Sequence, residues 1–178
     1  MIKRFRFRRA AVAAVAALAL AGGGAAWAAS SVSASTFPVG QCVPGDLAVW
    51  VNPDGADHTA GTTYYHLEYT NVSHITCFLW GYPGVLATTL DGKQLGAAAL
   101  HNDPVTEKNV YLAPGATAHS VLGYVDAAVD SSCKPTTAAY LKVYVPGAFG
   151  PNRAFFSLPV CTAAKPVDLT VWRFQAGV

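Results

Sequence analysis

The sequence predicts an all-β domain, and three of its features support that prediction. Apolar residues alternate with polar ones at period two, which places successive side chains on opposite faces of a strand, whereas helical apolar spacing is almost absent after residue 42. Pro-Gly pairs stand beside these runs, and such pairs form turns because proline presets φ and glycine accepts positive φ. The cysteines are an even set of four without a C-x-x-C pair, as expected for two structural disulfides.

Residues 1–28 have the features of a secretory signal peptide. Five basic residues and no acid precede a small apolar stretch, Ala10–Gly22, which is shorter than the roughly 18 to 20 residues that span a bilayer. An A-x-A cleavage signature follows at Ala26–Ala28. We therefore expect cleavage after Ala28 and a secreted or cell-wall-associated product with no stable membrane anchor. The alternative is an uncleaved N-terminal anchor.

Cleavage would reverse the sign of the net charge. The whole chain carries +2, but five of its twelve Lys and Arg residues and none of its ten acids lie in residues 1–28, which leaves −3. The basic surplus therefore gives no sign of a nucleic-acid partner. The polar segment 29–41 is predicted to be a flexible lead-in. Residues 42–178 are predicted to form one domain, since about 140 residues suffice for a single core.

Strand-like alternation and turn signals recur along residues 42–178. The strongest hairpin signal is Asp91-Gly92 between Leu86–Leu90 and Gln94–Leu100. The spacing predicts an antiparallel, immunoglobulin-like β-sandwich of about seven or eight strands, with a closed barrel as the alternative. The inward-facing sets are Leu47-Val49-Val51, Tyr65-Leu67-Tyr69, Leu141-Val143-Val145 and Val167-Leu169-Val171, and the Pro-Gly pairs begin at Pro44, Pro83, Pro114 and Pro146.

The four cysteines allow three pairings. Proximity in the chain and the positions of the predicted strands favour Cys42–Cys77 with Cys133–Cys161. Loops of this length would each stabilise the fold by about 3 to 4 kcal/mol in the chain-entropy model. Two disulfides are therefore predicted to stabilise the domain.

Several motifs occur in an order that is similar to a known family. They are Cys42 before Leu47, Gly61 before the aromatic segment 64–69, Asn71 with Ser73, Cys77–Val85, Asp91-Gly92, Leu112–Gly115 with Ala118, and Cys133 before Leu141 and Pro146. The chain resembles the domain of unknown function 4232 family, a group of exported, often lipid-anchored or membrane-tethered actinobacterial domains. The likeness covers roughly residues 42–161 and implies export, disulfides and an all-β fold. It implies no activity, substrate or catalytic residue, and this chain lacks the lipidated cysteine of the lipoprotein members.

The sequence offers weak candidates for catalysis or metal binding. It contains no nucleophile elbow, zinc-binding helix motif, phosphate-binding loop or EF-hand. His66 and Glu68 share a strand face and His119 lies on another predicted strand, but a metal needs three or four converging ligands. A triad using Ser120 has no local support. We expect no metal and no cofactor, and we interpret Asn71-Val72-Ser73 as a turn rather than a glycosylation site.

Aromatic residues are the best candidates for ligand contact. Trp80 and Tyr82 flank the turn at Pro83, and rings presented at a rigid rim favour recognition of protein or carbohydrate. Tyr64, Tyr140 and Tyr144 are predicted to lie on faces opposite the core, unless a second sheet covers them.

The function predicted from these features is a non-catalytic binding or interaction module. Its partner would be an envelope or extracellular protein or carbohydrate, contacted through Trp80, Tyr82 and Pro83. The alternatives are an exported hydrolase with an unrecognised site and a metal-handling domain.

Overall fold

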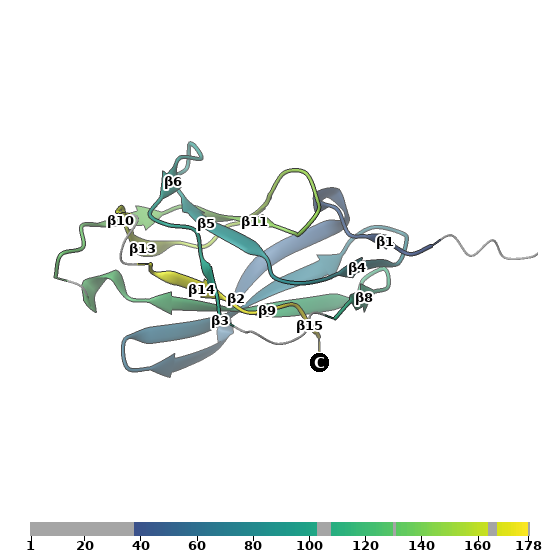
Figure 1. The fold of residues 1–178 in the computed structure, drawn as a ribbon, viewed down its shortest axis with the longest axis horizontal. Helices are drawn as coiled ribbons and strands as arrows, with labels where there is room; N and C mark the ends of the chain where they lie inside the picture. Colours follow the sequence, from purple (N-terminus) through teal and green to yellow (C-terminus); the bar gives the residue numbers. More distant parts are fainter. Residues whose placement is uncertain (1–37, 103–107, 130, 164–166, 178) are drawn as a thin grey trace, which may run out of the picture. The chain divides into compact units, whose positions relative to one another are not determined.

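The fold is built almost entirely of β-strands. A computed structural model describes residues 38–102, 108–129, 131–163 and 167–177, which form fifteen strands and two short 3₁₀ helices, η1 (Pro44–Asp46) and η2 (Ala127–Val129) (Figure 1). The predicted all-β class is confirmed. The predicted signal peptide, residues 1–28, lies outside the described residues. Among the described residues, no helix is long and apolar enough to cross a membrane.

The largest sheet has six strands and contains most of the predicted alternating segments. Its order is β2 (Leu47–Thr59), β3 (Thr62–Asn71), β9 (Thr117–Val125), β14 (Leu169–Val171) and β7 (Leu100–His101), with β15 (Gln175–Ala176) also pairing with β9. All neighbours are antiparallel except β14 and β7. The β2–β3 register shifts between Asn52 and Asp57, where the strand accommodates an irregularity.

The second sheet contains the predicted hairpin. Its order is β12 (Asn152–Ala154), β11 (Tyr140–Tyr144), β5 (Gly84–Thr88) and β6 (Gln94–Leu95), and every pairing is antiparallel. The turn joining β5 to β6 has Gly92 at φ 85°, which glycine adopts without the steric cost of a side chain. The second arm is shorter than predicted, because only two residues pair.

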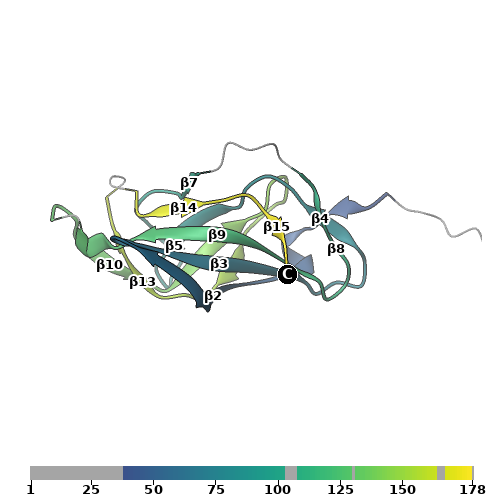
Figure 2. The same ribbon diagram turned by 90° about the horizontal axis from the view of Figure 1, so that it is seen from below.

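Each of two small sheets carries one disulfide. One has the order β1 (Gly40–Gln41), β4 (Cys77–Leu79) and β8 (Val110–Leu112), and the other pairs β10 (Pro135–Ala138) with β13 (Leu158–Cys161). Cys42 is bonded to Cys77 and Cys133 to Cys161, as predicted. The two small sheets lie at opposite ends of the ribbon in Figures 1 and 2. β1 consists of residues 40 and 41, the last two of the predicted lead-in, and they pair with β4.

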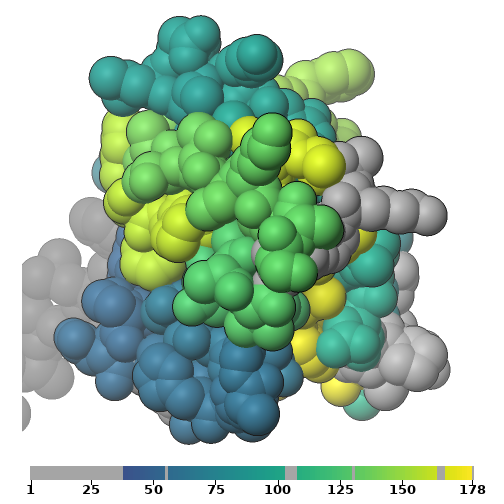
Figure 3. Space-filling view, turned by 90° about the vertical axis from the view of Figure 1, so that its left-hand side faces the viewer, coloured from purple at the N-terminus to yellow at the C-terminus, as the bar shows by residue number. Residues whose placement is uncertain are grey.

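The end that carries β10 and β13 is formed by connections from three parts of the chain. Figure 3 views this end, with the β2–β3 hairpin at the bottom in blue, the segment around η2 and β10 in green, and the β5–β6 hairpin at the top in teal. Backbone hydrogen bonds join these connections to one another. For example, the Asp126 N–H, just before η2, donates to the Gly61 carbonyl in the β2–β3 turn at 3.0 Å.

One hydrophobic core receives side chains from all four sheets. Most of the predicted inward-facing residues are buried. Val49 and Tyr65 pack against the core at partial burial, and Val167 is half-buried and lies outside the core cluster. The fifteen strands exceed the predicted seven or eight, because pairings of two residues are too short to show an apolar alternation.

Candidate functional site

Burial alternates along the segment that contains the predicted aromatic rim. Its odd-numbered positions from 77 to 83 are buried and its even-numbered positions are half-buried. The half-buried residues are Phe78, Trp80 and Tyr82, which we call the aromatic strip. Pro83, the third residue of the predicted rim, is buried, so the side chains accessible to solvent in this segment are those of the rings.

The aromatic strip is anchored at both ends. The Cys42–Cys77 disulfide holds its beginning, with the two Cα atoms 4.9 Å apart. Gly81, at φ 70°, allows a bend between Trp80 and Tyr82. The Gly81 carbonyl accepts a hydrogen bond of 3.1 Å from the Phe174 N–H, and Phe174 is itself buried. The rings are therefore carried on a backbone that is already ordered.

Two further rings extend the aromatic strip. Tyr111 on β8 is paired with Phe78 on β4, and their ring centroids are 5.9 Å apart. Tyr111 is 60% exposed, so most of its side chain is available to a partner. At the other end, Tyr82 stacks on His101 with centroids 4.5 Å apart and planes inclined by 10°. Sequence reasoning missed Phe78 and Tyr111, because their pairing joins segments far apart in the chain.

A hollow of about 320 Å³ opens beside Tyr111. We call it the Tyr111 groove. Its lining is mainly apolar, and its only ionisable groups apart from the Tyr111 phenol, among the described residues, are two cations, Lys108 and Arg173. One wall is formed by Lys108, Asn109, Val110 and Tyr111, and the other by Arg173, Phe174, Gln175 and Ala176.

The structure brings His66, Glu68 and His119 together in a second hollow of about 450 Å³. His66 Nδ1 lies 3.9 Å from Glu68 Oε1, and the two imidazole rings stack with centroids 4.7 Å apart. Ring-nitrogen lone pairs lie in the ring plane, so face-to-face rings do not direct them at a common ion. Among the described residues, no group of three or more His, Cys, Asp or Glu side chains is arranged to hold a metal.

Ser120 does not join these histidines in a triad. It is fully buried, and its Oγ lies 3.1 Å from the hydroxyl of Tyr69 on the core side of β9. Burial also raises the pKa of Tyr69, so both groups remain neutral hydrogen-bonding partners. Because neighbouring residues of a strand face opposite sides, Ser120 points away from His119.

The histidine pair predicts a pH dependence of stability. Partial burial, followed by the His66 imidazole, lowers the pKa of His119 from 6.5, while the Glu68 carboxylate opposes the shift. Below pH 6.5 the unfolded chain binds this proton before the native state does, so stability from this group is present above 6.5 and is lost as the pH falls toward the folded pKa. Urea unfolding at pH 5 and 7.5 should show a smaller pH difference for His119→Gln than for the wild type. An unchanged difference would contradict the assignment.

The remaining predicted aromatics differ in position. Tyr64 and Tyr144 are half-buried, but Tyr140 is buried at 1% exposure, so its predicted exposure is wrong. The Phe155 ring lies against it, and the Arg153 guanidinium lies 5.1 Å from its ring centroid. Both covering residues follow β11 in the chain, where the alternation within β11 gives no sign of them.

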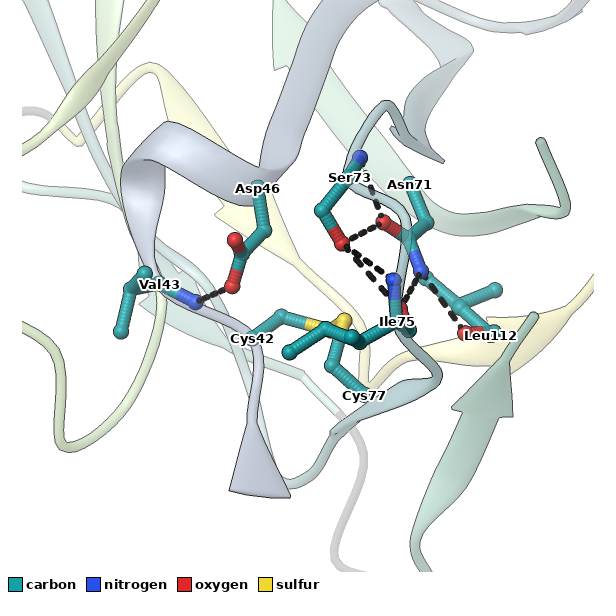
Figure 4. Close-up of a disulfide and its surroundings, with 8 residues drawn as sticks. All are labelled: Cys42, Val43, Asp46, Asn71, Ser73, Ile75, Cys77 and Leu112. Atoms are coloured by element: carbon teal, nitrogen blue, oxygen red, sulfur yellow. Dashed lines mark hydrogen bonds between the residues drawn. A yellow bond between two sulfur atoms is a disulfide. The ribbon is translucent and has the colours of Figure 1, made fainter. Parts of the chain in front are cut away.

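Asn71 organises the turn that leads into β4 (Figure 4). Its Oδ1 accepts bonds from the Ser73 N–H at 2.9 Å and the Ser73 hydroxyl at 2.7 Å. Its Nδ2 donates to the carbonyls of Ile75 and Leu112 at 2.8 and 2.9 Å. The side chain is fully buried, which supports the turn interpretation and leaves no room for a glycan in the folded state.

Comparison with known proteins gives one match. The family model described as Domain of unknown function (DUF4232) matches residues 42–177. Neither a curated protein nor a solved structure matches the chain.

Proposed function

The chain belongs to the DUF4232 family, and from this premise we propose that it acts as an exported, non-catalytic binding module. The observation that carries the proposal is the aromatic strip, Phe78, Trp80 and Tyr82, extended by the exposed ring of Tyr111. Aromatic rings are enriched where proteins bind partners, and they lose little conformational entropy on binding. The Cys42–Cys77 disulfide and the hydrogen bond to the Gly81 carbonyl already order the backbone of the strip, so less conformational entropy is lost when a partner binds.

The proposed location is the cell envelope or the medium. Two disulfides are typical of proteins outside the cytoplasm. We propose that residues 1–28 are removed on export and that the domain is an immunoglobulin-like sandwich. The contribution of both larger sheets to one core supports this architecture. The partner would be an envelope or extracellular protein or carbohydrate.

Replacing Trp80 tests the proposal. Because Trp80 is half-buried, Trp80→Ala should lower stability by about 1 to 2 kcal/mol, less than the roughly 3 to 5 of a fully buried tryptophan. Affinity for the partner should fall by about 2 kcal/mol, roughly 30-fold. Thermal melting measures the change in stability. The partner is captured from envelope extract with the domain as bait, and calorimetry with that partner measures the change in affinity.

A matched control is Trp50→Ala. Trp50 lies on β2 and is 42% exposed, so its removal should leave the affinity unchanged. Equal affinities of the wild type and the Trp80 variant, or a stability loss in the range of a core tryptophan, would argue against the binding role.

The hollow at His66, Glu68 and His119 is the observation that favours the alternatives, an exported hydrolase or a metal-handling domain. The stacked rings do not favour a shared metal ion. Elemental analysis of the purified protein separates a metal-handling function from the binding module.

A further inference from the structure

The hollow that holds His66, Glu68 and His119 lies on the outer face of the six-stranded sheet. Leu67 and Tyr69, on either side of Glu68, are fully buried. Because neighbouring residues of a strand face opposite sides, the Glu68 side chain points away from the core. Glu68 is paired directly with His119 across β3 and β9, which lie in front of β5 in Figure 2. The hollow therefore opens on the side of the sheet opposite the core.

The carboxylate of Glu68 lacks a close partner of opposite charge. The Glu68 side chain is only 14% exposed, and its one ion-pair contact among the described residues is with His66 Nδ1 at 3.9 Å. That distance is longer than a hydrogen bond, and His66 contributes a charge only when it is protonated. A mostly buried carboxylate costs free energy unless a cation or hydrogen-bond donors compensate for its lost solvation. The hollow therefore favours a positively charged ligand.

The histidine rings add hydrogen-bond acceptors beside this carboxylate. Partial burial lowers the pKa of His119, which keeps its imidazole neutral at pH 7.5. A neutral imidazole has one nitrogen that accepts a hydrogen bond. The stacking with His66 places two rings side by side, with centroids 4.7 Å apart. Neither lysine nor arginine is among the described lining residues, which are His66, Glu68, Ala116, Thr117, His119 and Gly177.

Acceptors that are separated from one another suit a planar cation with several donors. A guanidinium group has a permanent positive charge and five N–H donors in one plane, so it can pair with a carboxylate and donate to neighbouring acceptors at the same time. An ammonium group has the charge without the planar fork. A metal ion needs lone pairs directed at one point, which face-to-face rings do not provide. The volume of about 450 Å³ admits a side chain of several atoms.

We propose that this hollow binds the guanidinium group of an arginine side chain on a protein partner. The Glu68 carboxylate pairs with the guanidinium, and the imidazoles of His66 and His119 accept its remaining N–H groups. No residue of the aromatic strip lines the hollow. The inference therefore goes beyond the proposed function and does not depend on it.

A series of blocked amino acids tests the site. Titration with N-acetylarginine N-methylamide at pH 7.5, followed by NMR, should shift the imidazole resonances of His66 and His119 to saturation. Citrulline in the same blocked form keeps the shape without the charge and should bind at least about tenfold more weakly. Blocked lysine should bind about three- to tenfold more weakly than blocked arginine, because it lacks the fork.

The pH provides a second readout on the same protein. At pH 5 the affinity for blocked arginine should fall at least about threefold, because the imidazoles then bind protons in place of the N–H groups of the ligand. Glu68 is the one other titratable group among the described lining residues, and the lining residues Ala116, Thr117 and Gly177 contribute none. An affinity that is equal at pH 5 and 7.5 would contradict the role of the histidines.

Glu68→Gln keeps the shape of the side chain and removes its charge. This variant should bind blocked arginine at least about tenfold more weakly and melt no lower than the wild type, because no buried charge remains to be compensated. Asp57→Asn is the matched control. Asp57 is an exposed residue of β2 in the same sheet, so its substitution should leave the affinity unchanged. If Glu68→Gln does not fold, the comparison of arginine with citrulline on the wild type decides the matter.

Equal binding of blocked arginine and blocked citrulline, or full affinity in Glu68→Gln, would overturn the inference. Equal binding of blocked lysine would overturn the guanidinium assignment. A shift of the imidazole resonances by Zn²⁺ but not by blocked arginine would overturn it in favour of a metal site. The dependence of the captured partner on Trp80 is a separate measurement, so either proposal can fail while the other stands.

Discussion

Removing the Cys42–Cys77 disulfide is expected to destabilise the domain by about 4 kcal/mol. The bond closes a loop with a sequence separation of 35, and the chain-entropy model assigns a loop of this size roughly that value. This is a large share of the 5 to 15 kcal/mol by which domains are typically stable. Denaturant unfolding of the Cys42→Ala/Cys77→Ala protein measures the change.

The second disulfide provides a matched control. Cys133 and Cys161 are 28 residues apart, so their removal should cost nearly the same entropy. Only the first bond anchors the aromatic strip, however. Loss of Cys42–Cys77 should weaken partner binding in protein that remains folded, and loss of Cys133–Cys161 should not. Equal effects on binding would show that the disulfide does not preorganise the strip.

Replacing Asn71 by alanine is expected to lower stability by about 3 kcal/mol. Its amide makes four hydrogen bonds in a fully buried position, and alanine leaves the Ser73 N–H and the Leu112 carbonyl with fewer partners. Each buried polar group left without a partner costs about 1 to 3 kcal/mol. Urea unfolding gives the loss.

Two variants sharpen this test. Ser73→Ala removes only the hydroxyl and should cost about 1 kcal/mol. Asn71→Asp keeps the shape but cannot donate to the carbonyls of Ile75 and Leu112, so it should cost at least as much as the alanine variant. A loss below 1 kcal/mol in Asn71→Ala would mean that water replaces the amide and that the turn does not depend on it.

The strand faces and the disulfides could be predicted from the sequence because their signals are local. Leu67 and Val143 each lie in a run of period two, and that period alone assigns the buried face. The rim at Trp80 and Tyr82 was visible for the same reason. By contrast, Tyr111 acquires its role only from the register of β8 on β4, which depends on contacts between distant segments.

Asp168 is a second residue whose position could not be predicted from the local alternation. The alternation around it predicts an outward-facing carboxylate, but the residue is buried at 8% exposure. Its Oδ2 accepts a hydrogen bond from the N–H of Cys161, which compensates for the lost solvation. A buried acid can be recognised only once its partner is known.

The parallel pairing of β1 with β4, closed by Cys42–Cys77, also determines how the domain would carry a mechanical load. Tension applied to the chain before Gly40 passes through a covalent bond directly into β4, and the residues between the two cysteines are bypassed. The segment between Cys42 and Cys77, about 120 Å long when fully extended, therefore cannot be stretched while the disulfide is intact. A pull on that side would therefore reach the aromatic strip without first unravelling β2 and β3.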